Sequence, residues 1–144
     1  GFDTAMNYNK VSDMTNAIKE HAPDGVDVYY DNVGGSTLDG AMKNMNRFGR
    51  VVNCGAISLY NETELPTGPR LETTLVKKSI KMQGFIVNNY EKDFSEGIQQ
   101  LSRWLREGKL LHEETIMEGF DKTPQAFIDL FNGKNKGKMV VKVY

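Results

Sequence analysis

The sequence has very few residues of the types that form disulfides or hold metal ions. It contains one cysteine, Cys54, and two histidines among 144 residues. A single cysteine excludes an internal disulfide framework and is typical of a reducing compartment, so we expect a cytoplasmic protein. Two histidines and one cysteine are also a poor supply of zinc ligands, and we expect no bound metal.

Charge imbalance and long apolar runs are absent as well. Eighteen Lys and Arg residues against nineteen Asp and Glu residues leave a net charge of -1. This balance gives no electrostatic reason to expect nucleic acid as a partner. The uncharged stretches are too short to span a bilayer, and we expect no membrane partner. No methionine precedes Gly1, from which we expect that these residues are a piece of a longer protein.

Common catalytic and nucleotide-binding motifs are also missing, since no P-loop, HExxH, GxSxG, CxxC or G-x-G-x-x-G pattern occurs. What is present is an alternation of short apolar runs with amphipathic stretches, which predicts an α/β fold with a mostly parallel sheet. The expected strands are residues 5–8, 26–31, 50–54, 81–87, 112–118 and 139–143.

The end of the first well-defined strand carries a candidate binding residue. In an open parallel sheet, ligands bind at the carboxyl ends of the strands. Asn32 follows residues 26–31 and precedes Gly34 and Gly35, so an amide lies beside a backbone that a ligand can approach closely. A glycine-rich turn without a ligand explains the same residues and is favoured by the pattern alone.

The second strand end leads into an unusually long loop. Cys54, Gly55, Ala56, Ile57 and Ser58 come first, and Tyr60 then stands at the entrance of a loop that reaches Arg70. Loops of this length inside a domain are often functional, and a phenol held in a cleft can donate a proton. Taken alone, the pattern favours a surface tyrosine and a small buried cysteine.

Two further segments are open to two interpretations. Phe85, Ile86 and Val87 could wall a planar ring or could be ordinary core. The basic turn from Gly133 to Lys138 could meet a phosphate, although a solvated charge run is the commoner explanation.

The order of the short motifs is more specific than any one of them. They include Asp31-Asn32-Val33-Gly34-Gly35, Cys54-Gly55-Ala56-Ile57-Ser58 with Tyr60-Asn61, Met82-Gln83-Gly84-Phe85, and Gly133-Lys134-Asn135. In this order the chain resembles the C-terminal part of the leukotriene B4 12-hydroxydehydrogenase / prostaglandin reductase family, the zinc-independent branch of the medium-chain dehydrogenases/reductases. The resemblance covers essentially the whole chain.

The resemblance implies a fold and a division into domains. The fold would be the second half of a doubly wound Rossmann-type parallel sheet, followed by a C-terminal segment. Residues 1–112 would form a partial NADP-binding domain that lacks the first strands and the glycine-rich loop. Residues 113–144 would return to a substrate domain that the chain does not contain.

The resemblance also implies an activity, which is NADPH-dependent reduction of the C=C bond of α,β-unsaturated aldehydes and ketones. Hydride would go to the β-carbon, and Tyr60 would stabilise the enolate as the catalytic residue. The chain alone would be inactive, and the full protein would be a homodimer joined at the sheet edge from Lys81 to Val87. The NADP(H)-binding residues would be Tyr8, Asn32, Cys54, Gly55, Ala56, Ile57, Ser58, Tyr60, Phe85, Ile86, Val87 and Asn135.

Three alternatives remain open at this point. The chain could be a non-catalytic assembly module, or part of a quinone reductase of the same superfamily. It could also be a methyltransferase-type sheet, in which Asp31 would hold a ribose after the strand.

Overall fold

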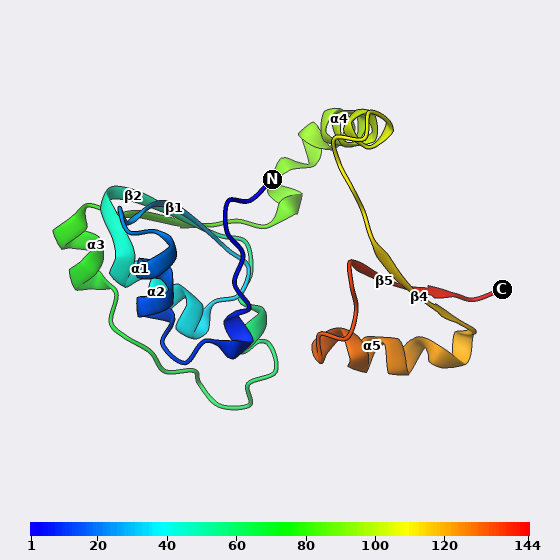
Figure 1. The fold of residues 1–144 in the computed structure, drawn as a ribbon, viewed down its shortest axis with the longest axis horizontal. Helices are drawn as coiled ribbons and strands as arrows, with labels where there is room; N and C mark the ends of the chain where they lie inside the picture. The colour runs from blue at the N-terminus through cyan, green and yellow to red at the C-terminus, as the bar shows by residue number, and fades with distance from the viewer. The chain divides into compact units, whose positions relative to one another are not determined.

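The computed structural model describes all residues from Gly1 to Tyr144 as two compact units, Gly1–Asn89 and Tyr90–Tyr144 (Figure 1). Each unit has its own parallel sheet. The compact units are defined by contacts within the chain, whereas the division expected at residue 112 concerns function. That functional division stays a prediction.

The first unit is a three-stranded parallel sheet whose strands alternate with helices along the chain. The strands lie in the order β1-β2-β3, and both neighbouring pairs are parallel. This is the arrangement expected for the second half of a doubly wound sheet, so the predicted fold class is confirmed. The elements are α1 (Met14–His21), β1 (Val26–Asp31), α2 (Gly35–Asn44), β2 (Met45–Asn53), α3 (Glu72–Lys78) and β3 (Lys81–Gly84).

One face of this sheet carries the core. Tyr29, Val51 and Met82 are paired in one row across the three strands, and they pack with Met42 and Met45 in the buried cluster. The helices lie on the same side of the strands (Figure 1). The sheet of the first unit is therefore stabilised by apolar burial on one face.

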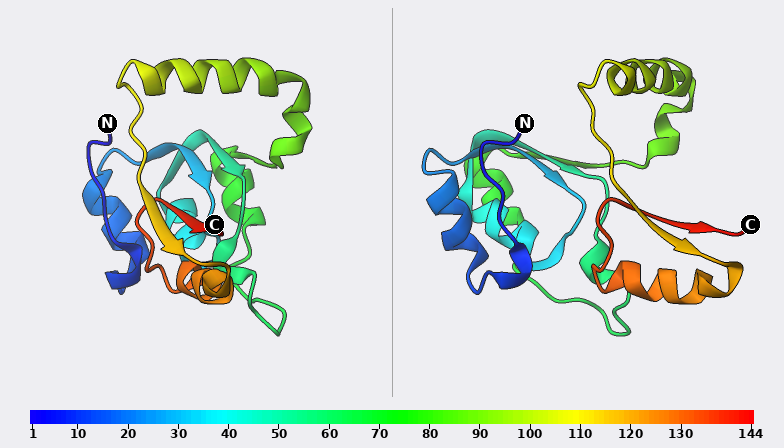
Figure 2. Two further views of the ribbon diagram at one scale, coloured as in Figure 1. Left: turned by 90° about the vertical axis from the view of Figure 1, so that its right-hand side faces the viewer. Right: turned by 45° about the vertical axis from the view of Figure 1, so that its right-hand side comes forward.

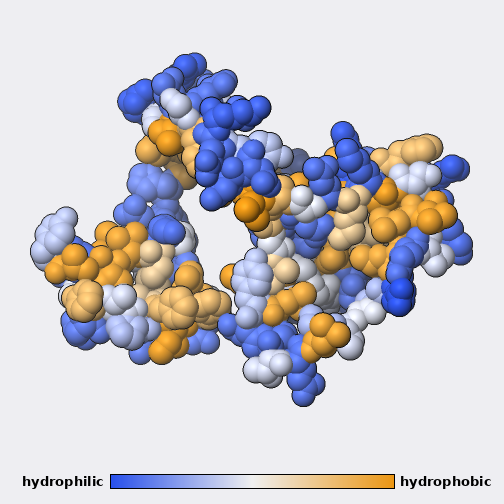
Figure 3. All heavy atoms as spheres, turned by 180° about the vertical axis from the view of Figure 1, so that it is seen from behind, coloured by the Kyte–Doolittle hydropathy of each residue, from blue (hydrophilic) through white to orange (hydrophobic).

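The opposite face of the sheet is largely exposed. Val28 is 52% exposed and Tyr30 is 55% exposed, and apolar side chains are visible on the molecular surface (Figure 3). A run as apolar as residues 26–31 is typical of a largely buried strand, and this interpretation is wrong here. The apolar composition predicted two covered faces, but the buried core of the first unit lies on one face alone.

The structure also changes the expected start of β2. The sequence predicted a strand from residue 50, but α2 ends at Asn44 and the strand already begins at Met45. The register shifts between Val26 and Val28 of β1, because β2 bulges there. Met45 kept the helical spacing of α2, yet it fills the core as a strand residue with 1% exposure.

The strand expected from Lys81 to Val87 ends at Gly84. The Phe85 N–H still donates to the Asn53 carbonyl oxygen at 3.0 Å. The next N–H, that of Ile86, donates instead to the Asn89 side chain at 3.0 Å. Residues Val87–Asp93 then form two short 3-10 pieces separated by a kink at Tyr90. The strand ends here because a local side-chain acceptor has replaced the neighbouring strand.

The second unit contains α4 (Phe94–Arg106), β4 (Glu114–Glu118), α5 (Thr123–Phe131) and β5 (Lys138–Lys142). Strands β4 and β5 are parallel, with Glu114 opposite Lys138 and Glu118 opposite Lys142. Helix α5 connects β4 to β5 along the chain and lies to one side of the two strands, as Figure 2 shows. Proline at the start of α5 and Gly133 after its end, at φ 63°, are typical of residues at the two ends of a helix.

Gly137 is the most demanding backbone position of the second unit. Its φ is 70°, and a Cβ atom there would collide with the backbone of Glu113. We expect Gly137→Ala to unfold this unit at lower urea concentration than Gly133→Ala does. Gly133 has a similar φ of 63° with no atom near its Cβ position, so this control measures the left-handed backbone alone, about 1 kcal/mol. Equal midpoints for the two variants would contradict the collision.

Candidate functional site

The three strands of the first unit end on one row. Asp31 of β1 is paired with Asn53 of β2, and Asn53 is paired with Gly84 of β3. The loops that follow the strands therefore leave the sheet together, at the carboxyl ends of the strands. A parallel sheet binds its ligands at these ends.

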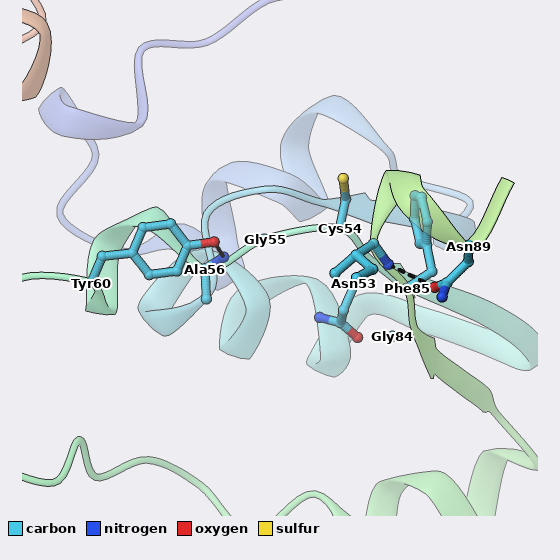
Figure 4. A pocket seen from close by; sticks show the side chains of 9 residues that line it. Asn53, Cys54, Gly55, Ala56, Tyr60, Gly84, Phe85 and Asn89 are labelled. Atoms are coloured by element: carbon cyan, nitrogen blue, oxygen red, sulfur yellow. Dashed lines mark hydrogen bonds between the residues drawn. The ribbon is translucent and has the colours of Figure 1, made fainter. Parts of the chain in front are cut away.

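An open pocket of about 500 Å³ lies at the carboxyl ends of the strands (Figure 4). The ends of β2 and β3 and the loops that follow them form its wall. Six of the residues expected to bind the cofactor line it, namely Cys54, Gly55, Ala56, Tyr60, Phe85 and Ile86. Three more lining residues, Asn53, Gly84 and Asn89, were not expected.

Tyr60 lies at the rim of the pocket with its hydroxyl held by the backbone. Its side chain is 63% exposed, and its oxygen accepts a hydrogen bond from the Ala56 N–H at 3.1 Å. Figure 4 shows the phenol reaching back along the loop to this group. Because the oxygen acts as an acceptor here, its own proton is free to be donated to another group.

Gly55 makes this position of Tyr60 possible. A Cβ atom at residue 55 would lie 3.0 Å from the Tyr60 hydroxyl and 3.4 Å from the Asn32 carbonyl oxygen. The missing side chain thus leaves room for the phenol to approach the backbone. The group that approaches this glycine closely is therefore a side chain of the same loop.

The apolar wall of the pocket is supported by Tyr30 on the exposed face of the sheet. The Tyr30 ring contacts the Phe85 ring edge to face, with centroids 6.1 Å apart and planes at 67°. Hydrogen bonding with the Cys54 side chain, followed by desolvation, raises the pKa of the Tyr30 phenol. Tyr30 therefore contacts one wall residue from the loop after β2, Cys54, and one from the chain after β3, Phe85.

Asp31 is fully buried beneath the loops, with 0% exposure. Its carboxylate accepts hydrogen bonds from the Tyr29 hydroxyl, the Val33 and Gly34 N–H groups, and the Asn53 side chain. Burial, then the nearby Asp31 carboxylate, raises the pKa of Tyr29 well above its usual range. A carboxylate occupied in this way cannot hold a ribose, which argues against the methyltransferase alternative.

The remaining expected site residues lie outside the pocket lining. Tyr8 is exposed in a 3-10 turn, Tyr8–Lys10, and residues 5–8 form no strand. Asn32 and Val87 are exposed, and Asn135 lies in the second unit, where its side chain donates to the Gly137 carbonyl oxygen at 2.6 Å. Ile57 and Ser58 join the two strand-end loops through N–H bonds to the Asn32 and Val33 carbonyl oxygens, both at 3.1 Å.

The missed residues carry weak sequence signals. Asn53 is the last residue of β2, and its type alone gives no sign that the side chain turns toward Asp31. Asn89 follows Ile86 by three residues, a spacing at which asparagine commonly caps a turn. That spacing could have indicated where β3 ends and that Asn89 lies beside the pocket.

The chain has no group of side chains suited to a metal ion, because nowhere do three or more His, Cys, Asp or Glu residues lie together for this purpose. None of the helices combines the length and apolar character that a membrane crossing needs.

Comparison with known proteins identifies the family. The model of the zinc-binding dehydrogenase family matches residues 1–103. The chain belongs to this family. The earlier resemblance is confirmed too, since the chain is 43% identical over 144 residues to prostaglandin reductase 1 of Bos taurus, covering 99% of the chain and 44% of the relative. The residues present do not form the zinc site that the family's name suggests.

Two further relatives of this chain carry more specific names. It is 38% identical to the 2-alkenal reductase (NADP(+)-dependent) of Nicotiana tabacum, covering 99% of the chain and 41% of the relative. The chain is also similar to the crystal structure of CurA in complex with NADPH from Vibrio vulnificus, with 39% sequence identity and a TM-score of 0.89. The match covers 100% of the chain and 44% of CurA. The chain thus spans less than half the length of the relatives that it matches.

Proposed function

We propose that this chain is the nicotinamide-side part of an NADPH-dependent reductase of the C=C bond in α,β-unsaturated aldehydes and ketones. The observation that carries the proposal is the pocket at the strand ends, which combines an apolar wall with a single phenol at its rim. The names of the alkenal reductase and of the NADPH complex of CurA support the substrate class and the cofactor.

The pocket fits the nicotinamide end of the cofactor better than its phosphate end. Phe85 and Ile86 offer an apolar surface to a planar ring, and Gly84 and Gly55 place backbone at the wall. None of the nine lining residues is Lys or Arg. Among the other proposed contacts, Tyr8, Asn32, Val87 and Asn135 would reach parts of NADPH outside this pocket.

The chemistry of the chain's own residues centres on Tyr60. When bound, NADPH would supply the hydride. As negative charge develops on the substrate's carbonyl oxygen, the Tyr60 hydroxyl would donate a hydrogen bond to it, and the Ala56 N–H would hold the phenol oxygen in place.

The test of this function is an NADPH oxidation assay with the longer protein that contains this chain. We expect a small enone to be reduced at the C=C bond, with product analysis showing a saturated ketone rather than an allylic alcohol. A matched quinone substrate serves as the control. Faster turnover of the quinone than of any enal or enone would favour the quinone reductase alternative, and no turnover with either would favour an assembly module.

We also propose that the full protein forms a homodimer through the open edge of β3. This strand pairs with β2 on one side, and its other edge has no partner in the chain. An unpaired edge offers N–H and C=O groups to a second copy. Its short length, Lys81–Gly84, limits the number of such bonds, so we expect that side chains beyond Gly84 would also contribute.

Sedimentation of the longer protein checks this proposal. We expect a dimer at micromolar concentration that dissociates on dilution, since edge pairing and side-chain burial are both required. A protein that stays monomeric throughout this range would contradict the dimer.

We further propose that the functional division of the chain lies at residue 112 and that the protein is cytoplasmic.

A further inference from the structure

The carboxylate of Asp31 lies at the site without lining the pocket. It is fully buried, and its four donors come from three places in the chain, namely β1, the turn after β1, and the end of β2. The N–H groups of Val33 and Gly34 donate to Oδ1 at 3.0 and 2.9 Å, and Asn53 donates to Oδ2 at 3.1 Å. One side chain therefore fixes two neighbouring strand ends to each other.

The backbone of the same residue continues this connection. The Asp31 carbonyl oxygen accepts the Cys54 N–H at 2.8 Å and the Gly55 N–H at 3.1 Å. Farther along, the Asn32 and Val33 carbonyl oxygens accept the N–H groups of Ile57 and Ser58. Backbone hydrogen bonds thus join residues 31–33 to residues 54–58, although β1 ends at Asp31 and β2 ends at Asn53.

These bonds lead to the proposed hydrogen-bond donor. Ala56, whose N–H holds the Tyr60 hydroxyl, lies between Gly55 and Ile57. The N–H groups of these two neighbours donate to the carbonyl oxygens of Asp31, the last residue of β1, and of Asn32, the residue after it. From this arrangement we infer that Asp31 is a positioning residue, whose carboxylate sets where the Tyr60 hydroxyl lies in the pocket. This inference rests on the function proposed for Tyr60.

Asp31→Asn is the sharpest test of the carboxylate. The substitution keeps the volume and Oδ1, but it places an amide nitrogen opposite the Asn53 side-chain nitrogen, so two donors face each other. Some loosening of the strand-end loops follows, and a displacement of about 1 Å at a reacting group can lower turnover about a hundredfold. The core itself, built from Met42, Met45 and Val51, is not altered.

The first measurement is steady-state kinetics of the longer enzyme with a small enone. Asp31→Asn should lower kcat between about tenfold and a hundredfold while the KM for the enone changes less than about threefold. Met42→Ala is the control, because it removes core packing on the helical face of the sheet. It should lower the melting temperature at least as much and leave kcat within about twofold. An equal loss of kcat in both variants would overturn the inference.

The second measurement does not depend on reductase activity. Cys54 directly follows Asn53, so its alkylation by iodoacetamide, followed by mass spectrometry of the peptide that contains it, reports on this loop. At a pH where the thiol is fully ionised in each protein, Asp31→Asn should react about tenfold faster than wild type, through more frequent local opening. Met42→Ala should stay within about twofold of wild type. Equal rates in the two variants would overturn the inference.

The two measurements separate the possible failures. If the wild-type enzyme reduces no enone, the proposed function fails, and the alkylation rates still decide whether Asp31 fixes the loop. If Asp31→Asn does not fold, Tyr29→Phe takes its place, since it removes one donor from the carboxylate and leaves the other three. We then expect a smaller increase in alkylation, about threefold, and no increase would overturn the inference.

Discussion

Replacing Tyr60 by phenylalanine is expected to lower kcat for a small enone by about ten- to a thousandfold, the range for loss of one oxyanion-stabilising donor. The phenol is at the pocket rim, and its oxygen accepts the Ala56 N–H, which leaves its proton for the substrate. The ring and its position in the loop are retained in the variant. The measurement is the rate of NADPH oxidation by the longer enzyme at saturating enone.

Two controls show whether the loss arises from the donor. Tyr144→Phe removes a phenol that is fully exposed at the end of the second unit, and kcat should not change. The affinity of Tyr60→Phe for NADPH, measured by fluorescence titration, should stay close to that of wild type. Unchanged turnover would remove Tyr60 from the mechanism, and a parallel loss of cofactor binding would assign it a binding role.

The 144-residue chain alone is expected to have no measurable reductase activity and to bind NADPH at least about a hundredfold more weakly than the longer protein, the scale of a lost main anchor. The pocket has no cationic lining residue, and the sequence has no G-x-G-x-x-G turn to place a helix N-terminus against the pyrophosphate. The contacts that remain are apolar or neutral. Fluorescence titration of both proteins with NADPH measures the difference.

A second observation on the same samples makes this test sharper. Nicotinamide mononucleotide lacks the adenosine and its phosphates, so its affinity for the chain and for the longer protein should differ much less than that of NADPH. A micromolar dissociation constant of the chain for NADPH would contradict the proposal. It would mean that the described residues hold the phosphates by contacts outside the strand-end pocket.

The sequence pattern predicted the strands of the first sheet, because each is a short apolar run bounded by a turn. Their arrangement as the second half of a doubly wound sheet came from the family resemblance, and it agrees with the tendency of consecutive parallel strands to be neighbours. It also located much of the pocket, since Gly55 and Tyr60 follow one strand and Phe85 follows the next. It did not predict the role of Asp31. The four donors to this carboxylate come from β1, its following turn and β2, and no local spacing indicates such a set.

The element ends were less predictable for a related reason. Met45 continued the apolar spacing of α2, so its place at the start of β2 depended on a bulge that only strand pairing produces. Residues 5–8 had strand-like composition, but no strand of the chain pairs with them. In both cases the local structure depended on whether a strand distant in sequence pairs with the segment: β1 pairs with Met45, and no strand of the chain pairs with residues 5–8.

The common row formed by Asp31, Asn53 and Gly84 has a consequence for folding during synthesis. The residues of β1, α2 and β2 leave the ribosome before those of β3, and domains of growing chains begin to fold from the N-terminal side. The Asp31 carboxylate can therefore bind Asn53 while the long segment to Lys81 is still emerging. Until β3 pairs, Val51 of the nascent chain has no neighbour on one side. That interval is when this chain is most exposed to aggregation or to a chaperone.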